Sequence, residues 1–397
     1  MPGATVLIAA WARSAVAPRG GALAALEPHE LAAPVVRALL ERGEITAASV
    51  DAVVIGNALG AGGNPARMVA LAAGLPERCA AFSIDTQCCA GLDAVSMGVG
   101  LIASGQAEVV IAGGVEAWSR SPIRQHRPMR EGEPARTFER PAFSPDPARD
   151  PDMLVSAAHY ALSHGFTREA QDAYAVSSHA RAVQHRHALA AEIVSVAGLQ
   201  RDAYPRMLDA ARAARMPLAL KAQAMQTEWL ARQAKGLDGA LSTVAVSAQA
   251  DGAAFVLLAS AAACERLGIK AHAAWIASAS VGCAPETPLL AAEAAAQSLL
   301  GRCALSADDV AVIELHDAFA VQGLSFCKGL NIDAARLNRR GGGLARGHPI
   351  GASAAIALVR VLADLVNPAG GEPRAARGMA VAAAAGGVGA AMLIERL

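Results

Sequence analysis

The feature that most constrains the fold is a series of short apolar runs that alternate with segments of helical spacing. Residues 50–56 and 109–114 are mostly Val, Ile, Ala and Gly, which is typical of strands buried on both faces. Residues 64–73 and 89–104 instead place their apolar side chains at helical intervals. Strands that alternate with helices predict an α/β fold, with a mainly parallel sheet covered by helices on both faces.

The same alternation returns after residue 239, which suggests a duplicated fold. In this second part we expect further strands and helices. The strands are expected at 253–260, 273–280 and 310–314, and the helices at 286–300, 319–329 and 352–365. The chain then ends in two apolar segments, 379–385 and 390–394, which flank a glycine turn. In the first part a strand is expected at 5–10 and a helix at 30–42.

The middle of the chain breaks this pattern. Residues 118–152 hold seven prolines and seven arginines, which predicts a long excursion over the surface. A helix is expected at 167–187, where Thr167 can cap the first turn. Residues 201–239 are irregular, with helical pieces expected at 204–215 and 223–233.

Composition excludes several classes of partner. The formal net charge is zero, which gives no basis for binding nucleic acid or an anionic membrane. No uninterrupted apolar stretch is long enough to predict a membrane span. The seven cysteines are scattered, without the spacing of a metal site or of a redox pair. We therefore expect a cytoplasmic protein that holds no metal.

Cys88 is the first candidate for chemistry. It follows an apolar run at 79–84, expected to be a buried strand, and precedes the helix expected at 89–104. The positive end of a helix dipole favours the thiolate, which is the nucleophilic form of cysteine. The small residues Ala90 and Gly91 would let a substrate approach the sulfur closely.

Two histidines are expected near the same edge of the sheet. His316 follows the strand expected at 310–314, and His348 lies on a glycine-flanked turn that opens a helix. Ligands of open α/β sheets bind at the carboxyl ends of strands, so these positions favour a site. A cysteine and two histidines can supply a nucleophile, an activating base and an oxyanion donor. The reaction that this set favours is acyl transfer through a thioester on cysteine.

Several motifs now make a family resemblance plain. The chain resembles the thiolases, a family of acyl-CoA C-acyltransferases, along nearly its whole length. The motifs that carry the resemblance are Gly56-Asn57-Ala58-Leu59, Cys88-Cys89-Ala90-Gly91-Leu92, Ala112-Gly113-Gly114-Val115-Glu116, Gln171-Asp172-Ala173-Tyr174-Ala175 and Gly347-His348-Pro349-Ile350-Gly351-Ala352-Ser353.

The resemblance implies a fold and an assembly. The fold is a duplicated five-layer α/β/α/β/α arrangement with an inserted loop domain. The implied parts are an N-terminal half at 1–117 and 241–270, a loop domain at 118–240 and a C-terminal half at 271–397. Acyl-CoA or CoA would bind as substrate, without a further cofactor, and the excursion at 118–152 would cover CoA and help assembly. A homodimer or homotetramer is expected.

The resemblance also implies roles for individual residues. Cys88 would be the acylated nucleophile, and His348 its activating base and an oxyanion donor. His316 stands where most thiolases have an asparagine that orients a water molecule. The backbone N–H groups of Cys88 and Ala385 would form an oxyanion hole, and the residues expected to contact CoA are Ser247, Phe319 and Met153.

The chain departs from the family at two places. Ala383 occupies the position of the second catalytic cysteine, whose thiol moves a proton on the α-carbon of the substrate. The loop at 246–253 is shorter than the corresponding pantetheine-binding loop. Three alternatives to a thiolase reaction therefore stay open: a decarboxylative or other condensing acyltransferase that uses the Cys-His-His set, a thioesterase or acyl carrier that stops at acyl-Cys88, and a non-catalytic acyl-CoA-binding protein.

Overall fold

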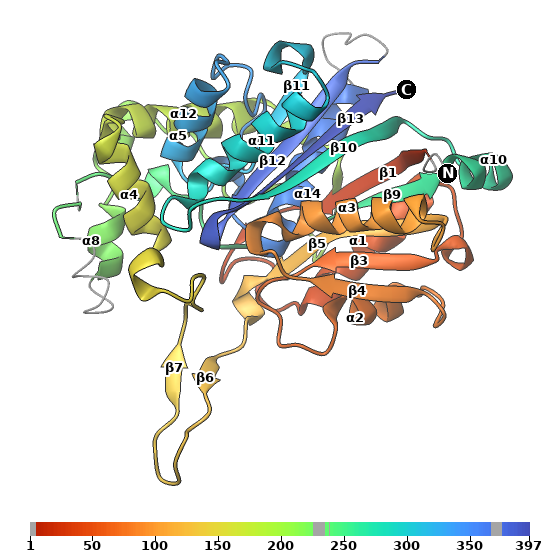
Figure 1. Ribbon diagram of the computed structural model, residues 1–397, viewed down its shortest axis with the longest axis horizontal. Helices are drawn as coiled ribbons and strands as arrows, with labels where there is room; N and C mark the ends of the chain where they lie inside the picture. Colours follow the sequence, from red (N-terminus) through yellow and green to blue (C-terminus); the bar gives the residue numbers. More distant parts are fainter. Residues whose placement is uncertain (1–4, 225–234, 238, 367–374) are drawn as a thin grey trace.

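The computed structural model describes residues 5–224, 235–237, 239–366 and 375–397 (Figure 1). Its main sheet has the strand order β11-β12-β13-β10-β1-β9-β5-β3-β4, with β2 and β8 at its side. The strands are β1 (Val6–Ser14), β2 (Ala17–Pro18), β3 (Ala52–Gly56), β4 (Ala80–Ile84), β5 (Val109–Ala117), β8 (Ile193–Val194), β9 (Ala250–Ser260), β10 (Ala273–Gly282), β11 (Val312–Leu315), β12 (Arg377–Ala384) and β13 (Val388–Arg396).

The strand order shows the expected duplication. From the centre outward, β1-β9-β5-β3 in the first half corresponds to β10-β13-β12-β11 in the second. The two halves join where β1 and β10 pair, with Leu7 opposite Ala274 and Ile8 opposite Ala273. Each half therefore contributes its own sheet, and a short antiparallel pairing connects them.

The prediction of a mainly parallel sheet is wrong. The strand pairs β3–β4, β3–β5 and β11–β12 are parallel, whereas β5–β9, β1–β9, β10–β13 and β12–β13 are antiparallel. An apolar run indicates burial but carries no information on strand direction. The tight turn around Gly386 returns the chain directly beside β12, which makes the β12–β13 pair antiparallel.

Helices and sheets alternate in five layers. The helices α3 and α14 pack between the two half-sheets in one buried cluster, and α14 is buried along almost its whole length. The outer face of the first half is covered by α1 and α2, and that of the second half by α11 and the end of α12. These helices are α1 (Pro28–Arg42), α2 (Pro65–Ala72), α3 (Ala90–Ala103), α11 (Ala291–Arg302), α12 (Ala320–Gly329) and α14 (Ile350–Val366).

Glycine permits the two central helices to approach closely. A Cβ atom on Gly91 would lie 2.8 Å from the carbonyl oxygen of Gly351 and 2.9 Å from the Cβ of Ala355. Gly91 is therefore small because α3 packs against α14. The interpretation that it leaves room for a substrate is wrong, because backbone and side-chain atoms of α14 already occupy that space.

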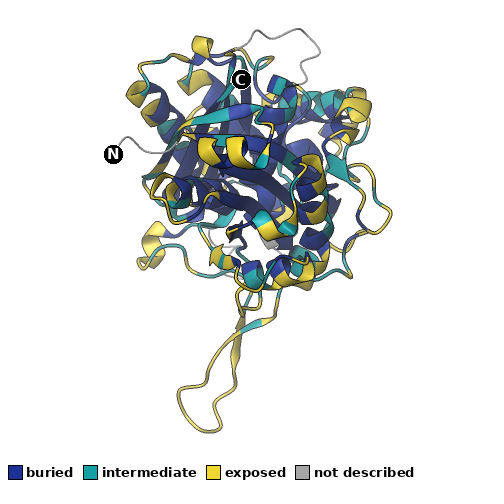
Figure 2. Cartoon of the chain, turned by 90° about the vertical axis from the view of Figure 1, so that its right-hand side faces the viewer, coloured by how far each residue is buried: buried dark blue, intermediate teal, exposed yellow. Residues whose placement is uncertain are grey.

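The middle of the chain forms a mostly helical region beside the second half-sheet, from which an arm projects. This arm is a two-stranded hairpin that extends away from the body and is largely exposed (Figures 1 and 2). The elements are β6 (Arg124–His126), β7 (Arg136–Phe138), α4 (Met153–Ser163), α5 (Arg168–Gln184), α6 (Arg186–Ala190), α7 (Ala210–Ala214) and α8 (Ala219–Ala224). The helix expected at 204–215 is thus limited to 210–214, and most of the piece expected at 223–233 lies outside the described residues. The domain boundaries stay a prediction.

The strand β4, which precedes Cys88, differs from its prediction. It pairs with β3 alone and lies at the edge of the sheet, and its residues are exposed or half-buried. Phe82 on this strand is 42% exposed. The apolar run at 79–84 is thus an open edge rather than the buried strand that was predicted, and such an edge can pair with another chain.

Two short helices complete the fold, α10 (Ala261–Leu267) and α13 (Gly343–Arg346). Among the described residues, no helix combines the length and apolar character needed to cross a membrane.

Candidate active site

The candidate nucleophile lies where β4 passes into α3. A single turn of 3₁₀ helix, Gln87–Cys89, connects the two elements, and Gln87 adopts a left-handed backbone conformation with φ of 54°. This turn directs the half-buried side chain of Cys88 towards α14. The Cys88 Sγ lies 3.2 Å from Nε2 of His348, so the structure brings together two residues that are 260 positions apart in the sequence.

Ser353 fixes the tautomer of His348. The Ser353 hydroxyl donates to the carbonyl oxygen of Pro349 at 2.9 Å, and it lies 2.7 Å from Nδ1 of His348. A hydroxyl has one proton, so Ser353 must accept at the second contact and His348 must carry its proton on Nδ1. Nε2 is then the unprotonated nitrogen, and it can accept the proton of the Cys88 thiol.

His316 lies directly against His348. Their rings are stacked, with centroids 4.3 Å apart and planes inclined by 29°. His316 follows the end of β11 and is buried, and its Nε2 has no hydrogen-bond partner among the described residues. Burial, His348 and Arg346 together lower the pKa of His316. The site therefore holds two neutral imidazoles, one of which presents an unpaired nitrogen.

The Cys88–His348 pair is neutral at rest. Burial raises the pKa of the Cys88 thiol to about 12 and lowers the pKa of His348 to about 4. The backbone N–H groups of Cys88 and Ala385 act in the opposite direction, because they stabilise the thiolate. Ala385 lies in the turn between β12 and β13, so both predicted oxyanion donors reach the vicinity of the sulfur.

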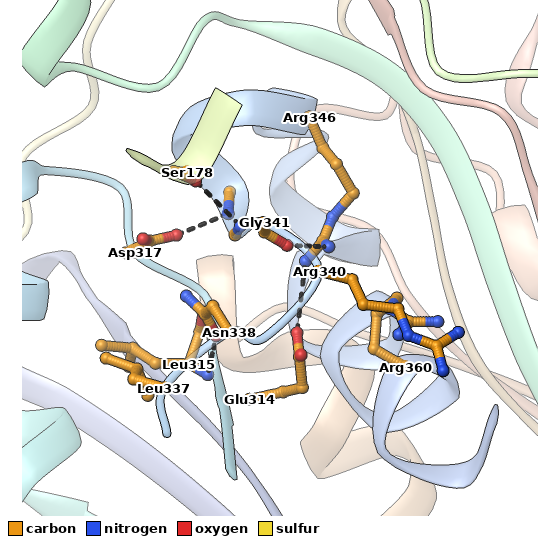
Figure 3. Close-up of polar contacts among 12 residues, drawn as sticks. Ser178, Glu314, Leu315, Asp317, Leu337, Asn338, Arg340, Gly341, Arg346 and Arg360 are labelled. Atoms are coloured by element: carbon orange, nitrogen blue, oxygen red, sulfur yellow. Dashed lines mark hydrogen bonds and ion pairs between the residues drawn. The ribbon is translucent and has the colours of Figure 1, made fainter. Parts of the chain in front are cut away.

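The loop that precedes His348 is fastened to Ser178 of α5 and to Asp317, the residue after His316 (Figure 3). The backbone N–H of Gly342 donates to the Ser178 hydroxyl, and the N–H of Gly343 donates to the Asp317 carboxylate. A Cβ atom on Gly343 would lie 2.7 Å from Cε1 and Nδ1 of His316, so only glycine fits at this position. The stacking of the two histidines thus depends on the close approach of this loop.

A buried ion pair supports the same connection. Arg346 lies two residues before His348, and Glu314 lies two residues before His316. Their side chains approach to 3.7 Å, and Arg346 also donates to the carbonyl oxygen of Gly341 at 2.6 Å (Figure 3). Neither carboxylate oxygen of Glu314 has a hydrogen-bond partner among the described residues, and burial raises its pKa to about 7.

Glu116 ties the two halves together behind the nucleophile. Its carboxylate accepts from Nδ2 of Asn57 and from the backbone N–H groups of Ala58, Leu59 and Gly351, at 2.9–3.2 Å. Burial raises its pKa to about 7, whereas these N–H donors favour the ionised form. The ends of β3 and β5 are thereby joined to the first turn of α14.

Sequence reasoning missed Glu116 and Ser353 as structural supports, although both residues lie inside quoted motifs. The partners of these two side chains are backbone groups, the Asn57 amide and a ring nitrogen of His348, and a sequence motif does not show which groups a side chain will meet. The available signal was the presence of a carboxyl and a hydroxyl group among glycines and alanines.

The residues expected to contact CoA lie near the segment that follows His316. The Ser247 N–H donates to the carbonyl oxygen of Ala318 at 2.8 Å, and its hydroxyl donates to that of Gly343 at 2.7 Å. Phe319 and Met153 share one apolar cluster with the start of α12. The structure thus gathers Ser247, Phe319 and Met153 in one region, while their role in CoA binding stays a prediction.

Ala383 offers no group that can move a proton. It lies near the end of β12, is 8% exposed and belongs to an apolar cluster with residues such as Val381 and Ala391. Among the described residues no group of His, Cys, Asp and Glu side chains has the arrangement of a metal site. The structure brings Cys88, His348 and His316 together here, and their catalytic roles stay a prediction.

The geometry defines an α/β protein with a cysteine–histidine nucleophilic pair between two half-sheets. The family model for the thiolase N-terminal domain matches residues 6–262, and the model for the thiolase C-terminal domain matches residues 269–396. The chain belongs to the thiolase family, and its fold is the five-layer thiolase fold. It is an acyl-CoA C-acyltransferase of the thiolase type, an enzyme that transfers an acyl group from CoA to a carbon atom.

Individual relatives agree with this family. The chain is 34% identical to an acetyl-CoA acetyltransferase of Pseudomonas aeruginosa, over 98% of this chain and 99% of the relative. The crystal structure of the Bacillus anthracis acetyl-CoA acetyltransferase superimposes with a TM-score of 0.88 and 29% identity, and covers all of both chains. A thiolase of Ascaris suum in complex with coenzyme A has a TM-score of 0.87 and 27% identity, over 99% of this chain and all of that one.

Proposed function

We propose that this chain transfers an acyl group between CoA thioesters through a thioester on Cys88, as an acetyl-CoA acetyltransferase or 3-ketoacyl-CoA thiolase does. The observation that carries the proposal is the hydrogen-bonded series Cys88–His348–Ser353, in which the bare Nε2 of His348 faces the thiol. A neutral thiol beside a correctly oriented neutral imidazole is the arrangement that general-base activation of a nucleophile requires.

The first half-reaction follows from these contacts. The Cys88 sulfur attacks the thioester carbonyl while Nε2 of His348 takes the thiol proton. The N–H groups of Cys88 and Ala385 donate to the oxyanion that forms on the carbonyl oxygen. The tetrahedral intermediate collapses, the CoA sulfur leaves with the proton held by His348, and an acyl-Cys88 thioester remains.

The second half-reaction involves His316. Cleavage or formation of the carbon–carbon bond places negative charge on the thioester oxygen of an enolate. Nε2 of His316 has no partner among the described residues, and its ring is stacked on that of His348, so with its proton on Nε2 the His316 imidazole can donate to this oxygen. Ser247, Phe319 and Met153 would hold the pantetheine arm of CoA, which acts as substrate. The proposal requires no resident cofactor.

A second candidate is a decarboxylative condensation, and Ala383 favours it. Its methyl group cannot remove a proton from the α-carbon of the second substrate. Loss of CO₂ from a malonyl-type thioester generates the same carbanion without a base. In this reaction Cys88, His348 and His316 would keep the roles described above, and only the source of the carbanion would differ.

One experiment separates these candidates. The protein is incubated with acetoacetyl-CoA and CoA, and separately with acetyl-CoA and malonyl-CoA, and the products are quantified; Cys88→Ala is the control. Cleavage of acetoacetyl-CoA supports the thiolase reaction, and CO₂ release with acetoacetyl-CoA formation supports the decarboxylative one. Hydrolysis to free acid alone would support a thioesterase, and binding without any turnover would leave an acyl-CoA-binding protein.

Assembly and location are also part of the proposal. The open edge of β4 with exposed Phe82 can pair with a second copy of this chain, so we propose a homodimer, with the projecting β6–β7 arm available to join two dimers into a tetramer. A cytoplasmic location is supported by the seven cysteines, all of which are free thiols in the structure.

A further inference from the structure

Trp118 is the one large aromatic side chain that lies edge-on to His348 among the described contacts. The ring centroids are 6.2 Å apart and the planes are inclined by 68°. Trp118 directly follows β5 and is half-buried, as are Cys88 and His348. Because all three side chains are partly accessible and both Cys88 and Trp118 lie against His348, they share one partly exposed part of the site.

The backbone that carries Trp118 is anchored by hydrogen bonds. The N–H groups of Trp118 and Ser119 and the hydroxyl of Ser119 all donate to the buried carboxylate of Asp251. The Ser119 hydroxyl in turn accepts from the backbone N–H of Gly20 at 2.9 Å. Bonds to Asp251 and Gly20 therefore anchor the backbone from which the indole projects beside His348.

The apolar residues expected to contact CoA have a different origin. The apolar cluster with Phe319 and Met153 draws on the helical region and α12, and Trp118 is not among its members in the part of the chain that the structure describes. If the pantetheine arm lies along that cluster, the acyl group on Cys88 can extend towards Trp118, which lies against the same His348 as the sulfur. The indole is then the bulky group that this acyl chain meets.

We propose that Trp118 determines specificity by limiting the acyl group on Cys88 to acetyl and its close homologues. The inference rests on the proposed function, because it requires an acyl-Cys88 thioester. A bulky indole on an anchored backbone beside the reacting atoms excludes each further methylene by steric overlap, and one methylene in a hydrophobic pocket changes discrimination roughly 10-fold or more. Removal of the indole opens a space that a medium-length acyl chain can fill.

The test is the chain-length profile of Cys88 acylation. Acetyl-, butyryl-, hexanoyl- and decanoyl-CoA are mixed with wild type, Trp118→Ala and Trp118→Phe, and the rate of acylation is followed by intact mass. We expect the hexanoyl-to-acetyl rate ratio to rise at least about 10-fold in Trp118→Ala and by less in Trp118→Phe. If Trp118→Ala does not fold, a rise of about threefold in the hexanoyl-to-acetyl rate ratio of Trp118→Phe supports the inference, and an unchanged ratio overturns it.

Trp11 supplies a matched control. It is also half-buried and contacts a histidine edge-on, with centroids 5.7 Å from His272 and planes at 87°, but it lies outside the site on β1. Trp11→Ala should leave the chain-length profile unchanged. An unchanged profile in the Trp118 variants, or rapid decanoylation of wild type, would overturn the inference while the proposed function stands. Failure of every acyl-CoA to acylate wild-type Cys88 would overturn both.

Discussion

Replacement of Ser353 by alanine tests the tautomer argument directly. Ser353 is 2% exposed, and its hydroxyl is the acceptor for the Nδ1 proton of His348. Without it a buried N–H loses its partner, which costs about 1–3 kcal/mol. The imidazole can avoid this cost by moving its proton to Nε2, but that tautomer cannot accept the proton of Cys88. Either outcome lowers the rate of Cys88 acylation, by roughly 5- to 150-fold.

The assay is single-turnover acylation by acetyl-CoA, quenched with acid and quantified by intact mass. Ser325→Ala is the matched control, because Ser325 is also a buried helical serine whose hydroxyl bonds a side chain, that of Tyr160 at 2.9 Å. The control should acylate at the wild-type rate. Acylation of folded Ser353→Ala at the wild-type rate would refute the proposed tautomer of His348.

Three further predictions follow from the same site. Gly343→Ala places a methyl group 2.7 Å from the His316 ring, so the rate of carbon–carbon bond cleavage should fall at least about 10-fold. The control is Gly301→Ala, whose added methyl group faces open space and should leave this rate unchanged. Equal rates in the two variants would show that the site does not require the close approach of Gly343 to His316. Burial raises the pKa of Cys88, so its alkylation by iodoacetamide should keep accelerating from about pH 6 to about pH 9, and a plateau over this range would indicate a resting thiolate instead. Burial raises the pKa of Glu314 from its ordinary 4.5 to about 7, so the folded protein binds this proton more tightly than the unfolded chain does. Ionisation of Glu314 therefore lowers the stability of the folded protein as the pH rises from about 4.5 to about 7. The melting temperature of wild type relative to Glu314→Gln should therefore fall between about pH 4.5 and pH 7 and stay level above it, and a constant difference would refute the raised pKa.

The fold was largely predictable from the sequence because its elements are strongly patterned. The apolar runs that became β3 and β5 and the helical spacing of α3 and α14 follow from local chemistry. Strand direction was not predictable, since it depends on which strand a returning segment meets. The exposure of β4 was not predictable either, because an apolar strand at the edge of a sheet and one in its core show the same sequence pattern.

The candidate site was partly predictable for the same reason. Cys88, His316 and His348 stand at strand ends or helix starts, and such positions converge at one edge of a sheet. The residues that position these side chains do so through tertiary contacts. Ser353 bonds Nδ1 of His348, Gly343 packs against the His316 ring, and Trp118 lies edge-on to His348. None of these contacts has a periodic signature, so the structure was needed to find them.

The most direct test of the account is the site of acylation itself. Wild-type protein and Cys88→Ala are exposed to acetyl-CoA, digested, and mapped by peptide mass spectrometry. The account predicts one acetyl group on the peptide that contains Cys88 and Cys89, with fragmentation placing it on Cys88, and none in the variant. An acetyl group on Cys89 or another residue, or equal acetylation of Cys88→Ala, would contradict the assignment of Cys88 as the nucleophile.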